Sequence, residues 1–349
     1  MALVIRWYDS FCLAIVGGAV SLSLWMIARS ELGGGRRRDD PSKYESLLIV
    51  ATGSNGEPEL RLRPAAASER GQVGYVQLWM SCWRGVHPAV LLVLRLISVA
   101  TMVSILSWDI VTYDASILLY YTEWTFALVI VYFAIATIVS AHGCWLYSKT
   151  CVTQDEEANK FLKGPLQQDN SVTLPLRNNK NMNAIRLQSY RDQEVNGEKA
   201  GFWGYAMQLI YQTSAGAVVL TDVVFWFLLV PFLSSEHFGL TSIMGCMHSL
   251  NIVFLLLDAF LNNLPFPWFR MAYFILWSCI YVTFQWVLHA CGFSWWPYPF
   301  LELDTPWAPL WYFCMALIHV PCYGIYWLII RAKNSFCPIF FPNAFIRAY

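Results

Sequence analysis

Long apolar runs, separated by polar segments, dominate the chain of 349 residues. A helix needs about 20 mostly apolar residues to cross the hydrocarbon core of a bilayer. Seven runs approach or exceed that length, and they cover residues 10–28, 88–108, 116–147, 203–233, 241–261, 270–290 and 308–331. The pattern predicts an all-α polytopic membrane bundle with about seven transmembrane helices, or six if the first run is not a span.

The first of these runs has the weakest signal. Arg6 precedes its apolar stretch, as in a signal peptide, but no clear small-x-small cleavage site precedes the polar segment that follows. Trp25 and Arg29 at its end are typical of a membrane interface. We expect a retained anchor helix, with a cleaved signal peptide as the alternative.

The runs and the segments between them predict six parts of the chain. Two polar loops lack apolar periodicity, so we expect them to be cytosolic and partly disordered. The parts are an N-terminal anchor helix (1–28), a polar loop (29–87), two transmembrane helices (88–147), a second polar loop (148–202), four transmembrane helices with a lumenal Y-P-F-L-E loop (203–331) and a cytosolic tail (332–349).

Charged residues alternate between the two sides of the predicted bundle. The loops 29–87 and 148–202 carry nine and eight Lys or Arg residues, whereas the loops 109–115, 234–240 and 291–307 carry none and are acidic. Because basic loops stay on the cytosolic side, the N-terminus is predicted to be outside or lumenal and the C-terminus cytosolic.

Composition narrows the class of protein further. Hydrophobic residues make up 57% of the chain and charged residues 13%, while the formal net charge is zero. We therefore expect membrane lipids as partners and no nucleic acid. The ten cysteines form no C-x-x-C pair and no P-loop or G-x-G-x-x-G occurs, so we expect no metal and no cofactor. An integral multi-pass protein of the endoplasmic reticulum or the plasma membrane fits these features.

Two polar residues inside the apolar runs could form a catalytic pair. Counted from the predicted lumenal ends of their spans, Thr125 lies about 13 Å deep and His248 about 10 Å deep. A hydroxyl and an imidazole are the minimum for nucleophilic acyl transfer, because the imidazole removes the hydroxyl proton. The alternative is structural: a threonine bonded to a carbonyl one turn earlier and a buried histidine with a backbone partner.

Three acidic residues, Glu123, Asp258 and Glu302, and the histidine His289 are supporting candidates. Glu123 lies near the N-terminal end of its span, where a carboxylate is stabilised by the helix dipole. Asp258 could pair with Arg95 or join a network near Asn262, whereas Asp222 has no assignable partner.

The segment "CGFSWWPYPFLELD" follows His289. Its aromatic and proline content fits an interfacial re-entrant or lid-like segment. Glu302 within it has either a structural or an orienting role.

Several of these segments resemble a known family. "MGCMHSLNIVFLLLDAF" and "WVLHACGFSWWPYPFLEL" resemble membrane proteins of the androgen-induced-gene type, in which a His is followed ten residues later by an acid, then by W-V-x-H and Y-P-F-L-E. "YYTEWTF" is similar to the entry of that family's nucleophile helix, and more closely to the related rolling stone proteins. The likeness covers roughly residues 110–330, and the long loops are similar to a plant-like rolling-stone branch.

The resemblance implies an intramembrane threonine hydrolase that cleaves fatty acid esters of hydroxy fatty acids. The family's nucleophile carries over onto Thr125 and its base onto His248, whereas Asp258 stands where the hydrolases have Glu. Thr122, Ser249 and Asn251 are the nearby polar candidates for oxyanion donors. The main alternative is a non-enzymatic scaffold or fusion-associated protein of the rolling stone type. A seven-span receptor and a haem protein that uses His248 and His319 are further alternatives.

Overall fold

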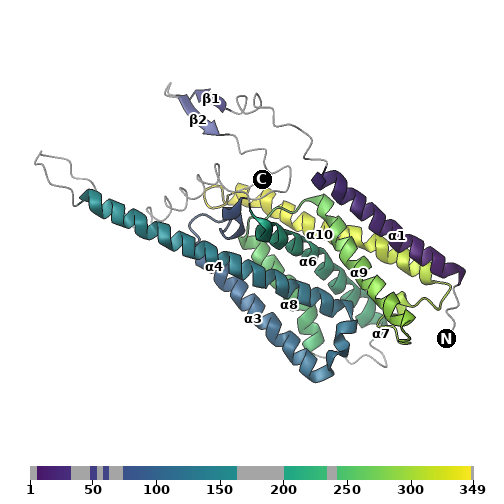
Figure 1. The fold of residues 1–349 in the computed structure, drawn as a ribbon. Coiled ribbons are helices and arrows are strands. Elements are labelled where there is room, and N and C mark those ends of the chain that lie inside the picture. The colour runs from purple at the N-terminus through teal and green to yellow at the C-terminus, as the bar shows by residue number, and fades with distance from the viewer. Residues whose placement is uncertain are drawn as a thin grey trace, which may run out of the picture.

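The computed structural model describes residues 6–32, 48–52, 58–62, 74–162, 200–233 and 242–346. Within them, long helices lie side by side in one bundle, and the chain ends N and C lie toward opposite ends of it (Figure 1). The bundle consists of the helices α1 (Trp7–Ile27), α3 (Pro88–Tyr113), α4 (Tyr121–Leu162), α6 (Phe202–Val224), α8 (Ser242–Leu261), α9 (Met271–Ala290) and α10 (Ala308–Phe340).

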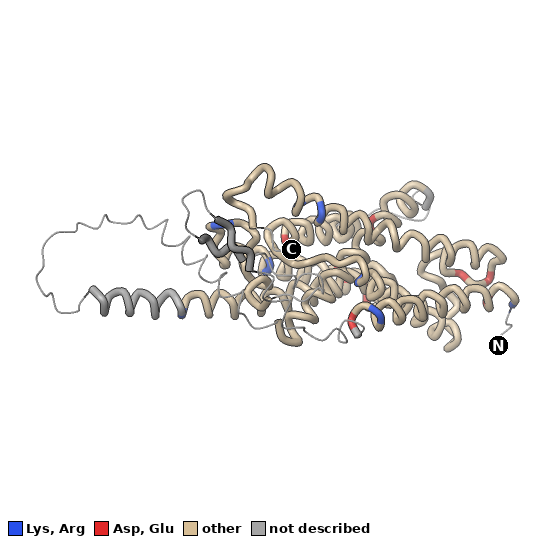
Figure 2. Tube along the Cα trace, turned by 90° about the horizontal axis from the view of Figure 1, so that it is seen from above, with Lys and Arg blue, Asp and Glu red and all other residues tan. Residues whose placement is uncertain are grey.

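Seven helices in the described residues are long and apolar enough to cross a membrane, which confirms the predicted fold class. Figure 2 shows few charged residues along the length of the bundle. Large apolar side chains point outward from it, among them Val111, Ile138 and Phe227, which are each at least 70% exposed. Such a surface is stable against lipid tails and unstable in water, so the protein is an integral multi-pass membrane protein.

Two helices extend beyond the apolar runs that predict them. Helix α4 continues to Leu162, into the predicted polar loop, and α10 continues through Pro338 to Phe340. At the other end of α4, the expected start at residue 116 is wrong. Residues Ala115–Leu119 form a 3-10 helix and Tyr120 is extended, so α4 begins at Tyr121. Hydropathy does not distinguish these backbone conformations.

Most of the two long polar loops lies outside the described residues. The described part of the first loop contains an antiparallel pair of strands, β1 (Leu48–Thr52) and β2 (Pro58–Leu62), which the sequence did not predict. A short 3-10 helix (Tyr75–Leu78) follows, and Leu78 is fully buried. The Cys82 backbone N–H donates to the carbonyl of Leu261, the last residue of α8, at 2.9 Å. The end of this loop thus satisfies a backbone carbonyl at the C-terminal end of α8.

Helix α6 is the centre of the bundle and is the most buried of the seven spans. It packs against α4, α8, α9 and α10. Gly216 is required on the α9 side, because a Cβ there would lie 2.7 Å from the Phe274 ring. Helix α1 is the least buried span and packs on α9 and α10 at the outside (Figure 1).

A buried ion pair joins three helices near the end of α8. Arg95 Nε on α3 donates to Asp258 Oδ1 at 2.8 Å, and both side chains are fully buried. Arg95 also donates to Ser140 Oγ of α4 at 2.6 Å, and Asp258 accepts from the Tyr132 hydroxyl and from Asn262 Nδ2. The two predicted alternatives for Asp258, a pair with Arg95 and a network with Asn262, are therefore formed together.

Cations also fix the ends of two helices. Lys333 Nζ donates to the Ala259 and Asn262 carbonyls at 2.7 and 2.8 Å, which satisfies the C-terminal end of α8. Arg270 donates to Gln212 Oε1 at 3.0 Å and lies 3.7 Å from Glu31 Oε1. This contact ties the chain that leaves α1 to the body of the bundle.

Breaking the buried pair should strongly destabilise the bundle. Asp258→Ala leaves the Arg95 guanidinium buried without its carboxylate, and we expect a loss of about 3–5 kcal/mol in the free energy of unfolding in detergent. The double variant Arg95→Met with Asp258→Leu should recover most of that loss. Asp304→Asn, at an exposed carboxylate 3.5 Å from Arg6, is the control and should change nothing measurable. A wild-type stability for Asp258→Ala would contradict this assignment.

Candidate functional site

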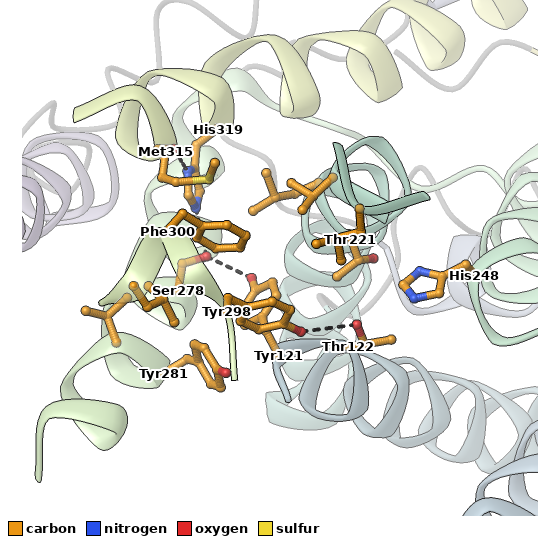
Figure 3. Close-up of a pocket in the computed structure, with 15 residues that line it drawn as sticks. Tyr121, Thr122, Thr221, His248, Ser278, Tyr281, Tyr298, Phe300, Met315 and His319 are labelled. Atoms are coloured by element: carbon orange, nitrogen blue, oxygen red, sulfur yellow. Dashed lines mark hydrogen bonds between the residues drawn. The ribbon is translucent and has the colours of Figure 1, made fainter. Parts of the chain in front are cut away.

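A cavity with an internal volume of about 80 Å³ opens between α4, α6, α8, α9 and α10 (Figure 3). This volume holds several water-sized groups, since each needs about 10–15 Å³. Most of the wall is apolar, but side chains with hydroxyl or imidazole groups reach it from five helices and from the loop between α9 and α10. These polar residues are Tyr121, Thr122, Thr221, His248, Ser278, Tyr281, Tyr298 and His319.

The loop between α9 and α10 covers one side of this cavity. Tyr298, Phe300 and Leu301 of the loop line the wall, and the first two rings stack with centroids 5.0 Å apart. The Tyr312 hydroxyl of α10 donates to the Leu301 carbonyl at 3.0 Å and fixes the loop there. Residues of the aromatic loop thus form part of the cavity wall.

His248 reaches the cavity from α8 and is only 6% exposed. Its ring stacks on Phe225, the residue that follows α6, with centroids 3.7 Å apart and an interplanar angle of 9°. Its Nδ1 lies 3.5 Å from Asp222 Oδ1, which is longer than an ordinary hydrogen bond. Phe225 opens a π-helical turn (Phe225–Leu229), a local irregularity that is frequent at functional sites.

No partner for Asp222 can be assigned from the sequence, because nothing in the sequence shows which face of α6 meets α8. The structure places this carboxylate beside His248, where it can orient the ring or stabilise its protonated form. A carboxylate twenty-six positions before a histidine carries no sequence signal of its own. Asp222 is therefore a functional candidate that only the packing of α6 against α8 identifies.

Thr125 is fully buried in α4, one turn after Tyr121. No group in the described part of the chain forms a hydrogen bond with its Oγ1, although the Tyr121 hydroxyl approaches it without ordinary hydrogen-bond geometry. The bond to a carbonyl one turn earlier, which was the structural alternative, is not formed. Thr125 does not line the cavity, and its Oγ1 makes no hydrogen bond with His248.

The depth predicted for Thr125 changes with the start of its helix. Thr125 lies four residues after Tyr121, or about 6 Å along the axis of α4, instead of about 13 Å from a start at residue 116. His248 lies six residues into α8, or about 9 Å along its axis, close to the expected 10 Å. The two residues remain near the same end of their helices.

A second histidine with a hydroxyl partner faces the cavity. His319 Nε2 of α10 lies 2.8 Å from Ser278 Oγ of α9, and His319 Nδ1 lies 2.6 Å from the Met315 carbonyl. Ser278 Oγ also lies 2.8 Å from the Tyr121 hydroxyl. Figure 3 shows this chain of groups at one end of the lining residues and His248 at the other end.

Ser278 was not singled out by the sequence, because a serine in an apolar helix commonly bonds to its own backbone. From the sequence, His319 is a candidate only as a haem ligand together with His248. A signal was available, since a histidine deep inside an apolar run is costly and needs a polar partner. The sequence does not say which helix supplies that partner.

The supporting candidates lie away from the cavity wall. Glu123 is 6% exposed in the first turn of α4, and in the described chain its Oε2 makes no hydrogen bond. His289 stacks on Trp296 with centroids 3.5 Å apart, and Glu302 is exposed just after the 3-10 helix Pro299–Leu301. Asp258 is committed to Arg95. None of the four contacts the space between the two histidines.

Comparison of the chain with family models, with curated proteins and with solved structures gives no match. The likeness to androgen-induced-gene-type and rolling stone proteins therefore rests on the quoted segments alone. The geometry of the cavity is independent of that likeness.

Tyr298 provides a test of how closely the loop covers the cavity. Burial raises the pKa of Tyr298 to about 12, against a smaller opposing effect from the Thr122 hydroxyl at 3.5 Å. An unfolded tyrosine titrates near pH 10. The folded protein thus holds a proton that the unfolded chain loses between about pH 10 and 12, so stability falls as pH rises through that window.

We expect the ultraviolet difference titration of wild type against Tyr298→Phe to show one tyrosine ionising near pH 12. Both proteins are compared in the same detergent, so that the signals of the other tyrosines cancel. Ionisation of Tyr298 near pH 10 would mean that the loop leaves the cavity open to water.

Proposed function

We propose that the protein hydrolyses lipid esters inside the membrane. The observation that carries this proposal is the largely apolar cavity between the helices, whose wall holds two imidazoles and several hydroxyl groups. An apolar wall can accommodate a fatty acyl chain, and a hydroxyl activated by an imidazole can attack the ester carbonyl. The likeness to hydrolases of fatty acid esters of hydroxy fatty acids supports the same substrate class.

The resemblance assigns the nucleophile to Thr125 and the base to His248. Two features support a working role for these groups. Within the described residues, both Thr125 Oγ1 and His248 Nδ1 are buried without a hydrogen bond, and such atoms call for a functional explanation. Asp222 beside His248 completes a base with an orienting carboxylate. The Thr122 and Tyr298 hydroxyls at the wall are candidate donors to an oxyanion.

A non-enzymatic membrane scaffold is the second candidate. Two observations favour it. Thr125 Oγ1 forms no hydrogen bond with His248, and Thr125 does not line the cavity. In a scaffold these residues would contribute only to helix packing. Hydrolysis of a lipid ester separates the two functions.

The direct test is an assay of purified protein in detergent with a branched fatty acid ester, measuring released fatty acid. We expect turnover by the wild type. Loss of at least about 100-fold in both Thr125→Ala and His248→Ala would assign the chemistry to that pair. A wild-type rate in Thr125→Ala would assign the nucleophile to another hydroxyl of the cavity. No turnover by wild-type protein that elutes as a folded monodisperse species would favour the scaffold.

Filling the cavity should remove activity without touching any reactive group. Leu229 lines the cavity from the π-helical turn, so Leu229→Trp should lower fatty acid release at least tenfold by excluding the acyl chain. Phe227→Trp is the matched control, because it places the same ring two residues earlier on a side chain that is 74% exposed. Equal rates in both variants would mean that the substrate binds elsewhere.

A further inference from the structure

We infer that Ser278 is the nucleophile of this cavity and that His319 is its base. The inference rests on the proposed ester hydrolysis and replaces its nucleophile. Ser278 and His319 both line the cavity, on α9 and α10, and their Oγ and Nε2 atoms are 2.8 Å apart. This is the contact that defines a nucleophile and its base, and the other hydroxyls of the wall make no such contact with an imidazole within the described chain.

The partners of the His319 ring fix where its proton lies. The Met315 carbonyl can only accept, so at 2.6 Å the Nδ1 atom of His319 must carry the hydrogen. The neutral ring then presents a lone pair at Nε2, and the hydrogen between Nε2 and Ser278 Oγ belongs to the serine. This is the tautomer that a general base requires.

The same reasoning sets the direction of the next hydrogen bond. Ser278 has one proton, and its acceptors are His319 Nε2 at 2.8 Å and, at the longer distance of 3.3 Å, the Phe274 carbonyl. The Tyr121 hydroxyl at 2.8 Å therefore donates to Ser278 Oγ. A donor already aimed at the serine oxygen stabilises negative charge that develops there as the proton leaves. The His319 ring is held from its other side by Phe274, with centroids 4.6 Å apart. The pair is therefore assembled before substrate binds.

The chemistry balances with an ester and water alone. The Ser278 proton passes to His319 Nε2 while Oγ forms a bond to the ester carbonyl carbon. Collapse of the tetrahedral intermediate breaks the bond to the alcohol oxygen, which takes the proton from His319 and leaves as the free alcohol. Water then gives a proton to His319 and attacks the acyl-serine, and the returning proton restores Ser278 as the fatty acid departs.

The position of Ser278 also suits an ester of a long chain. Leu301 and Phe300 of the covering loop and Met315 of α10 are apolar lining residues of the same cavity. Thr122 and Tyr298, whose hydroxyl oxygens are 3.5 Å apart, are on the wall and can turn toward a carbonyl oxygen. An acyl chain and its carbonyl thus find both kinds of surface beside Ser278.

The test is covalent labelling of wild-type protein with a long-chain fluorophosphonate, followed by peptide mass mapping of the modified residue. The hydroxyl oxygen forms a bond to phosphorus, fluoride leaves, and the serine proton passes to the base. We expect the label on Ser278. A label on Thr125 would overturn the inference and keep the hydrolase. Ester turnover with the label on neither residue would also overturn it, and absence of both label and turnover would remove the proposed function as well.

Variants separate chemistry from packing. His319→Gln keeps a polar side chain but removes the base, and we expect labelling of Ser278 to slow at least about 100-fold. Ser278→Ala should leave no label in its peptide, whereas Ser214→Ala is the matched control at another buried serine and should label like the wild type. A wild-type labelling rate in His319→Gln would make the contact a packing interaction. If Ser278→Ala does not fold, the map of the wild type still decides the question.

Discussion

The hydrogen-bonded ion pair of Arg95 and Asp258 is the interaction on which the rest of the bundle depends. A guanidinium and a carboxylate at membrane depth are each costly, and only a complete set of partners compensates that cost. Those partners come from α3, α4 and α8, together with the Leu78 carbonyl of the preceding loop. The helices must therefore adopt one register, because a shift of one residue would leave a charge without its partners.

That register has a direct effect at the other end of the same helices. Helix α4 supplies Tyr121 and Thr122 to the cavity and α8 supplies His248, and both helices are fixed through Tyr132 and Asp258. The remaining wall comes from α6, α9, α10 and the aromatic loop. Reactive groups in a site of this kind need fixed positions and little water, since electrostatic interactions are stronger in a low-dielectric surrounding. The buried pair supplies rigidity without occupying the cavity.

The sequence predicts the spans well and the site only in part, for a physical reason. Apolar length alone decides which segments can cross a bilayer, so all seven helices follow from hydropathy. The pair of Arg95 with Asp258 could be foreseen because few charges were available inside the runs. By contrast, the contacts of Asp222 with His248 and of Ser278 with His319 depend on how helices are rotated about their axes. Near-uniform apolar faces in membrane helices leave that rotation undetermined.

The peripheral position of α1 has a consequence for how the protein is made. This helix is synthesised before α3 to α8, yet it packs on α9 and α10, which are synthesised after them. Its own hydrophobicity is enough to hold it in the bilayer, but its docking surface does not exist until the C-terminal spans have been inserted. Helix α1 is therefore surrounded by lipid until α9 and α10 have been inserted. The packing of α1 on α9 and α10 is therefore a late step in the assembly of the bundle.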